Sequence, residues 1–216
     1  MRKLLIATAN KGKFAEFFGI LKNLPFQLLT LKDIIIPQNF QVKETGKTLA
    51  ENAVLKAKAY GKLSGLLTLA DDTGLYVDNL AGRPGVATHR YAHGSDENRY
   101  QKLLKKLKGV SQVNRGAKFI SAIALFDPKS NIIKVTTGEC YGWIADRPKG
   151  THGFGFDPVF VVEDLGKHFA ELSLAEKNQV SHRAKALQKM KKILLKLSKD
   201  NLITKDKRPL GKYNHF

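Results

Sequence analysis

Two adjacent aspartates follow a short apolar run and precede a threonine and a glycine. Residues 66–70 predict a buried strand, and Asp71-Asp72-Thr73-Gly74 then predicts a turn at its end. Carboxylate and hydroxyl oxygens in such a place suit Mg²⁺, which usually takes one or two carboxylates and completes its shell with water and phosphate oxygens. A polar turn without a ligand is the alternative, because Asp and Gly are common in turns for local reasons.

A second polar stretch lies between an expected strand, residues 3–7, and an expected helix, residues 12–23, whose phenylalanines recur at helical spacing. Helix N-terminal amides favour anions, and lysines add positive charge. The stretch therefore predicts a phosphate site, with an ordinary N-cap flanked by lysines as the alternative. Its residues are Thr8, Ala9, Asn10, Lys11, Gly12 and Lys13.

The helix expected over residues 49–63 has one acid inside its first turn and another before it. Thr48 is a plausible N-cap, and Glu51 stands three residues later as its capping-box partner. Glu44 lies outside the helix and is freer to bind a metal, although the sequence leaves Glu44 and Glu51 as competing candidates. Lys56 is either a solvated helix lysine or a phosphate contact.

A glycine-bounded aromatic loop, G-F-G-F-D-P at residues 153–158, can stack on a flat ligand. Phe154 and Phe156 flank Gly155, where the backbone can approach a base closely, and Asp157 fixes the turn. A loop whose aromatics are simply buried is the alternative.

The last predicted helix begins after Ser181, which we expect to be its cap. His182 and Arg183 then fall in the first turn, where two donors are unfavourable for the helix dipole. This placement indicates a ligand acceptor nearby, with tolerated exposed charge as the alternative.

The remaining pattern predicts an α/β fold with a long mixed sheet flanked by helices. Residues 26–30 predict a further strand, and residues 95–107 predict a helix capped by Ser95. Residues 117–126 and 132–143 alternate as two long strands joined by residues 127–131, which predicts a hairpin and a mixed rather than a purely parallel sheet.

Length and composition favour one domain. The 216 residues are 43% hydrophobic, enough to bury a full core, and no apolar run approaches the roughly 20 residues needed to span a bilayer. A strand pattern follows Met1 directly without a signal-peptide pattern, so we expect a cytoplasmic protein. The single cysteine, Cys140, excludes an internal disulfide and is expected to be a packed thiol.

The formal net charge of +18 is concentrated near the C-terminus. Residues 185–216 hold ten Lys or Arg and two Asp, a net charge of +8. We expect a solvated helix face and, over residues 199–216, a basic polar tail that is disordered or loosely packed. Nucleic-acid binding is an alternative, but no recognition module accompanies the charge.

Taken together, these stretches resemble the Ham1-like inosine triphosphate pyrophosphatases, enzymes of non-canonical purine nucleotides. The resemblance covers residues 4–197 through five ordered blocks. They are T-A-N-K-G-K at 8–13, E-T-G-K-T-L-A-E-N-A-V-L-K-A at 44–57, A-D-D-T-G-L-Y-V-D-N-L-A-G-R-P-G-V at 70–86, G-F-G-F-D-P-V-F at 153–160 and A-E-L-S-L-A-E-K-N-Q-V-S-H-R at 170–183.

The resemblance implies one domain over residues 1–198, with two lobes around the sheet and a cleft between them, and usually a homodimer. It also implies hydrolysis of ITP, dITP and XTP to the monophosphate and pyrophosphate. Glu44 and Asp72 would bind Mg²⁺, and Asp72 would also activate water. The implied substrate contacts are Thr8, Asn10, Lys13 and Lys56 for the triphosphate, with Thr73 beside them, and Phe154, Gly155, Phe156, Asp157, Lys177, His182 and Arg183 for the base.

Two departures from the family pattern affect this assignment. Lys43 stands where many relatives carry a second acid, and Ala87-Thr88-His89 replaces a more usual Tyr-Ser-Ala before Arg90. Two other functions stay open: a Maf-like nucleotide pyrophosphatase with another base preference, and a basic nucleic-acid-binding protein.

Overall fold

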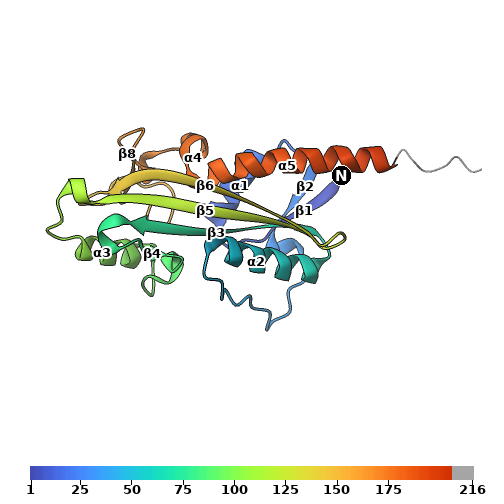
Figure 1. Ribbon diagram of the computed structural model, residues 1–216, viewed down its shortest axis with the longest axis horizontal. Coiled ribbons are helices and arrows are strands. Elements are labelled where there is room, and N and C mark those ends of the chain that lie inside the picture. The colour runs from blue at the N-terminus through green and yellow to red at the C-terminus, as the bar shows by residue number, and fades with distance from the viewer. Residues whose placement is uncertain (206–216) are drawn as a thin grey trace, which may run out of the picture.

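An eight-stranded mixed sheet forms the centre of the molecule in a computed structural model that describes residues 1–205, with side chains described up to residue 199 (Figure 1). The strands are β1 (Arg2–Ile6), β2 (Phe26–Leu29), β3 (Leu67–Val77), β4 (Arg83–Gly85), β5 (Gly116–Asp127), β6 (Ile132–Ile144), β7 (Phe160–Val162) and β8 (Lys167–His168). The helices are α1 (Lys11–Leu21), α2 (Leu49–Ser64), α3 (Asp96–Lys106), α4 (Leu174–Val180) and α5 (His182–Lys205).

The sheet joins a parallel part to an antiparallel part. Its order is β2-β1-β3-β5-β6-β7-β8, with β4 paired to β3. Strand β1 runs parallel to both β2 and β3, whereas β5 and the strands beyond it pair antiparallel. The expected hairpin after residue 126 and the mixed sheet are therefore confirmed.

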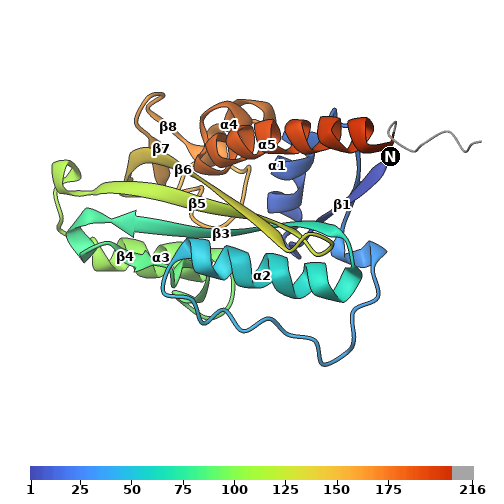
Figure 2. The same ribbon diagram turned by 45° about the vertical axis from the view of Figure 1, so that its right-hand side comes forward.

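Helices cover both faces of the sheet. Helices α1, α4 and α5 lie on one face, and α2 covers the other (Figures 1 and 2). A core cluster that includes Phe17, Leu69 and Leu187 fills the α1–α5 side, and an alanine-rich cluster that includes Ala57 and Ala124 allows α2 to pack close to the sheet. A third cluster joins α3 to the far end of the long strands.

The expected turn at Asp71-Asp72-Thr73-Gly74 is wrong. Strand β3 continues without a break to Val77, so both aspartates lie inside a central strand. Because side chains alternate along a strand, Asp71 and Asp72 point to opposite faces of the sheet. Gly74 serves packing rather than a turn, since a Cβ there would lie 2.8 Å from the Gly85 carbonyl oxygen of β4.

Other expectations meet mixed outcomes. Cys140 is a buried thiol, and burial raises its pKa to about 11. Helix α5 continues to Lys205, beyond the expected start of a tail at residue 199, and residues 206–216 of that tail lie outside the described residues.

The division of residues 1–198 into two lobes stays a prediction. None of the helices within residues 1–205 is long and apolar enough to cross a membrane.

Gly138 of β6 permits the first turn of α5 to lie directly against the sheet. A Cβ at this position would collide with the His182 carbonyl oxygen and the Ala186 amide nitrogen, both of which are backbone atoms of α5. The absence of a side chain at residue 138 thus sets the position of His182 and Arg183.

We predict that Gly138→Ala destabilises the protein by about 1–3 kcal/mol, because backbone on both sides must move to admit the methyl group. Chemical unfolding measures the loss. Gly19→Ala is the matched control, since its added Cβ meets only the amide tip of the Asn178 side chain in a helix that gains propensity from alanine. Equal stability of the two variants would contradict this account of Gly138.

Candidate active site

Asp71 is the centre of a buried charge network on the α1–α5 face of β3. Its carboxylate lies 3.0 Å from Lys13 Nζ of α1 and 3.2 Å from Arg183 Nε of α5. The Thr73 hydroxyl donates to Asp71 at 3.1 Å and accepts from Arg183 Nη2 at 2.9 Å. The aspartate side chain is 2% exposed, so these partners are what make a charge tolerable inside a central strand.

Glu16 of α1 completes this network and was not among the residues predicted from sequence. Its buried carboxylate lies 2.9 Å from Lys177 Nζ and also pairs with Arg183 Nη1. Lys177 in turn pairs with Asp157. The available signal was an acid within the apolar stripe of α1, one helical turn before the buried Ile20.

The network keeps Asp71, Glu16 and Arg183 charged despite their burial, whereas burial dominates at Lys13, whose pKa is lowered, and at Asp157, whose pKa is raised. Burial alone would raise the pKa of Asp71, but Lys13 and Arg183 outweigh it and hold that pKa well below its usual value. Burial likewise opposes ionisation of Glu16, whose pKa is nevertheless lowered by Arg183 and Lys177. The pKa of Arg183 is raised by the same two carboxylates against the effect of burial.

Arg183 has buried carboxylate partners, where the sequence indicated a ligand acceptor or tolerated exposed charge. Its side chain is 1% exposed and donates to Asp71, Glu16 and Thr73. Buried acids therefore compensate the cation in place of a ligand acceptor, because α1 and β3 bring carboxylates that the local sequence could not reveal.

His182 is the residue of this turn whose polar atoms lack partners. Its ring is stacked on Phe119 with 4.7 Å between centroids and 13° between planes, and neither ring nitrogen has a hydrogen-bond partner among the described residues. Burial and the cations of Arg183 and Lys177 hold its pKa well below the usual value. The ring is therefore neutral at neutral pH, with one donor and one acceptor nitrogen.

The aromatic loop is held by its own aspartate. Asp157 accepts from the Phe154 amide at 2.8 Å and pairs with Lys177, while Phe156 is buried in the third core cluster. Phe154 lies under Lys177 Nζ, 4.6 Å from its ring centroid, and against Gly12, where no side chain would fit.

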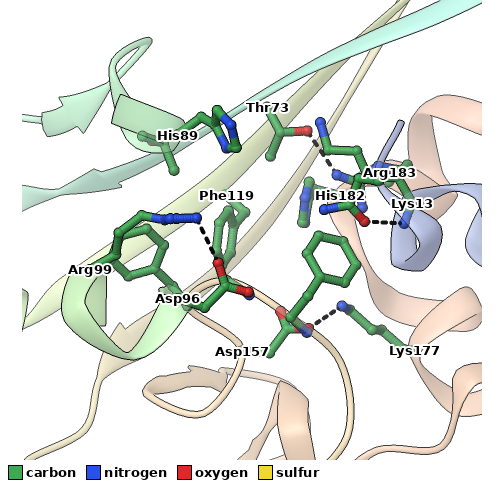
Figure 3. A pocket seen from close by; sticks show the side chains of 15 residues that line it. Lys13, Thr73, His89, Asp96, Arg99, Phe119, Asp157, Lys177, His182 and Arg183 are labelled. Atoms are coloured by element: carbon green, nitrogen blue, oxygen red, sulfur yellow. Dashed lines mark hydrogen bonds and ion pairs between the residues drawn. The ribbon is translucent and has the colours of Figure 1, made fainter. Parts of the chain in front are cut away.

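These groups line one pocket (Figure 3). The predicted residues that line it are Asn10, Lys13, Thr73, Phe154, Gly155, Phe156, Asp157, Lys177, His182 and Arg183. Residues that sequence reasoning did not assign to the site also line it, namely Thr88, His89, Asp96, Arg99 and Phe119. Thr8, Ala9, Lys11, Gly12, Glu44, Lys56 and Asp72 are not part of its lining.

Asp72 belongs to a second cluster on the α2 face of β3. Its Oδ1 lies 3.0 Å from Lys56 Nζ, and its Oδ2 accepts from the Asn52 amide at 3.2 Å. Glu44 lies 3.4 Å from the same Lys56 nitrogen. Lys56 is thus neither solvated nor unpaired, and its ammonium group stands between the two predicted metal ligands.

Local capping accounts for two of the candidate residues. Glu51 accepts from the Thr48 and Lys47 amides, so the capping box is present and, within the part of the chain that the structure describes, Glu51 pairs with neither Lys56 nor the Asp72 cluster. The Asn10 side-chain oxygen accepts from the Lys13 amide at 2.9 Å and caps α1, while the residue still lines the pocket.

The charges of the two clusters do not cancel. Three carboxylates (Glu16, Asp71, Asp157) balance three cations (Lys13, Lys177, Arg183) in the first cluster. In the second, Glu44 and Asp72 share only Lys56. The described residues contain no group of three or more His, Cys, Asp or Glu arranged for a metal. The carboxylates of Glu44 and Asp72 match the usual number of protein ligands of Mg²⁺, which fills its remaining positions with water and phosphate oxygens.

Comparison with known proteins identifies the family of the chain. Residues 4–193 match the model of the Ham1 family. The chain is 42% identical to a dITP/XTP pyrophosphatase of Bacillus subtilis over 90% of this chain and 98% of that protein, and 47% identical to one of Geobacter sulfurreducens over 88% and 96%. A solved HAM1 protein of Coxiella burnetii superposes with a TM-score of 0.80 at 36% identity, covering 91% of this chain and 100% of that one. The chain therefore belongs to the Ham1 family.

Proposed function

We propose that this protein hydrolyses non-canonical purine nucleoside triphosphates (ITP, dITP and XTP) to the monophosphate and pyrophosphate. Such a reaction removes altered bases from the nucleotide pool. Family membership supports it, and the pocket offers groups for both a purine and a phosphate chain.

The observation that carries the proposal is the unpartnered His182 ring in the pocket wall. A neutral imidazole can donate one hydrogen bond to the 6-keto oxygen of inosine or xanthosine. Adenine presents an amino group there, so the tautomer of His182 that donates to a 6-keto oxygen would set donor against donor, and an unpaired buried donor costs about 1–3 kcal/mol. Phe154 offers a ring face beside this position, with Gly155, Phe156, Asp157, Lys177 and Arg183 holding the surrounding wall.

The triphosphate would bind at the start of α1. Lys13 lines the pocket, and the turn from Thr8 to Gly12 presents helix N-terminal amides and the exposed Lys11. Lys56 contacts Asp72 on the α2 face of β3. It would contact the phosphates together with the Asp72 cluster.

Glu44 and Asp72 would hold Mg²⁺, as their shared contact with Lys56 Nζ supports. When bound, the ion supplies charge neutralisation on the phosphate oxygens. The Asn52 amide and the Lys56 ammonium orient the Asp72 carboxylate.

Asp72 would accept a proton from the attacking water. The water oxygen forms a bond to the α-phosphorus as the bond from that phosphorus to the α–β bridging oxygen breaks. Pyrophosphate leaves with the bonding electrons, and the nucleoside monophosphate remains. Lys13 and Lys56 stabilise the charge that develops on the phosphate oxygens.

We also propose that the protein is a homodimer, which the family resemblance implies, and that it is cytoplasmic, as the strand pattern near Met1 without a signal-peptide pattern supports. Sedimentation of the purified protein tests the dimer, since a monomer at micromolar concentration would exclude it. Cell fractionation tests the location.

A substrate panel tests the proposed reaction. Purified protein is incubated with ITP, XTP, GTP and ATP in the presence of Mg²⁺, and pyrophosphate and orthophosphate are assayed separately. We expect pyrophosphate from ITP and XTP and little turnover of ATP, whereas GTP, which shares the 6-keto oxygen, shows whether the 2-amino group is rejected as well. Preference for another base would favour a Maf-like enzyme. Salt-sensitive retention on nucleic acid without any turnover would favour the nucleic-acid-binding alternative.

We predict different consequences for the two adjacent aspartates. Asp72→Asn should lower kcat by about 10²–10⁴-fold, because an amide cannot accept the proton, and should cost less stability than Asp71→Asn, because Lys56 keeps Glu44 as a counter-charge. Asp71→Asn should cost about 3–5 kcal/mol of stability, because Lys13 and Arg183 lose their shared buried counter-charge. Pyrophosphate release and urea unfolding measure both, and near-wild-type kcat in Asp72→Asn would refute the assigned role.

We predict a pH dependence of stability that originates from His182. The lowered pKa of its folded form means that the unfolded chain binds a proton that the folded chain excludes below about pH 6.5. Stability should therefore fall as pH decreases through 6.5, by at most about 1.4 kcal/mol per pH unit from this residue. His182→Phe should remove that part of the slope in urea unfolding between pH 7 and 5, whereas exposed His93→Gln should retain it. An unchanged slope in His182→Phe would be the contrary result.

A further inference from the structure

Asp96 joins two separate walls of the pocket. It lies in the first turn of α3 and lines the pocket opposite the α1–α5 wall (Figure 3). One carboxylate oxygen, Oδ2, accepts from the Gly155 amide at 2.6 Å, 59 residues away in the chain. The other, Oδ1, lies 2.9 Å from Arg99 Nη2. One side chain thus ties helix α3 to the aromatic loop.

The aromatic loop needs support at this point. Gly155 has a left-handed backbone with φ of 66°, and a Cβ added there would meet nothing within 4 Å, so no neighbouring side chain packs against that side of the residue. The preceding amide, that of Phe154, is bound by Asp157. Two successive amides of the loop are therefore held by two different carboxylates, one within the loop and one from α3.

Arg99 fixes the carboxylate that makes this contact. The arginine side chain is 13% exposed and lies one helical turn after Asp96 on the same face of α3. With Oδ1 held by the guanidinium, Oδ2 stays directed at the Gly155 amide. A charge-assisted hydrogen bond of this kind is stronger than one between neutral groups.

We propose that Asp96 is a positioning residue for the purine: it holds the Phe154–Gly155 peptide across the pocket so that the Phe154 ring faces the base. This inference rests on the proposed function. Asp96 acts through the loop and has no role in phosphate binding or in bond cleavage. Its loss should therefore weaken the binding of ligands that carry a base and spare ligands that lack one.

The test compares three variants in steady-state kinetics with ITP. Asp96→Ala removes the acceptor, and Asp96→Asn keeps an oxygen that can accept from Gly155. Glu97→Ala, an exposed acid of the same helical turn, is the matched control. We expect Asp96→Ala to raise KM about tenfold or more with little change in kcat, consistent with a hydrogen bond to a charged group. Asp96→Asn should restore KM to within about threefold of wild type, and Glu97→Ala should match wild type.

Inhibition by tripolyphosphate and by IMP separates positioning from general damage. Asp96→Ala should weaken inhibition by IMP as much as it raises KM and leave inhibition by tripolyphosphate unchanged. Unchanged KM in Asp96→Ala, equal losses in Asp96→Ala and Asp96→Asn, or equal losses for IMP and tripolyphosphate would each overturn the proposal. If Asp96→Ala fails to fold, Asp96→Ser, whose side chain is too short to reach Gly155, takes its place. A wild-type protein inactive on ITP and XTP would refute the proposed function instead.

Discussion

The buried charge network around Asp71, Glu16 and Arg183 is the constraint on which the rest of the site depends. It joins α1, β3, α4, α5 and the aromatic loop through contacts between oppositely charged groups that are almost inaccessible to water. Removing one partner of a buried pair leaves an uncompensated charge and typically costs about 3–5 kcal/mol. The network therefore stabilises one arrangement of the five segments, and the pocket surfaces of Lys13, Lys177 and Arg183 are positioned before any ligand arrives.

The two faces of strand β3 carry aspartates with different roles, one structural and one assigned to catalysis. Asp71 faces the balanced network, where its charge serves packing, whereas Asp72 faces α2, where Glu44 and Asp72 outnumber their one shared cation. Alternation along a strand is the reason that two neighbours in sequence can have such different surroundings. Across the two clusters, five carboxylates (Glu16, Asp71, Asp157, Glu44 and Asp72) meet four cations (Lys13, Lys177, Arg183 and Lys56), so these paired side chains together carry one excess negative charge.

Local sequence patterns predicted the elements well and the side-chain partners poorly. Thr48 and Glu51 formed the expected capping box because capping depends on residues three apart. The turn at Asp71 failed because the groups that admit an aspartate to a central strand are distant in sequence; Arg183 lies 112 residues away. For the same reason the sequence indicated a ligand acceptor or exposed charge at Arg183 rather than buried acids, and neither Glu16 nor Asp96 was recognised. Ten of the residues that the family resemblance implied line one pocket, whereas their burial and pairing required the folded chain.

The surplus of negative charge makes a direct test of this account possible. A non-hydrolysable ITP analogue is titrated calorimetrically into the protein with Mg²⁺ and again in excess chelator, with inosine as the uncharged comparison. The account predicts that the analogue loses about two orders of magnitude in affinity without the cation, while inosine binds equally in both conditions. Equal affinity of the analogue with and without Mg²⁺ would show that the side chains alone neutralise the triphosphate, and would contradict the charge balance proposed for the two faces of β3.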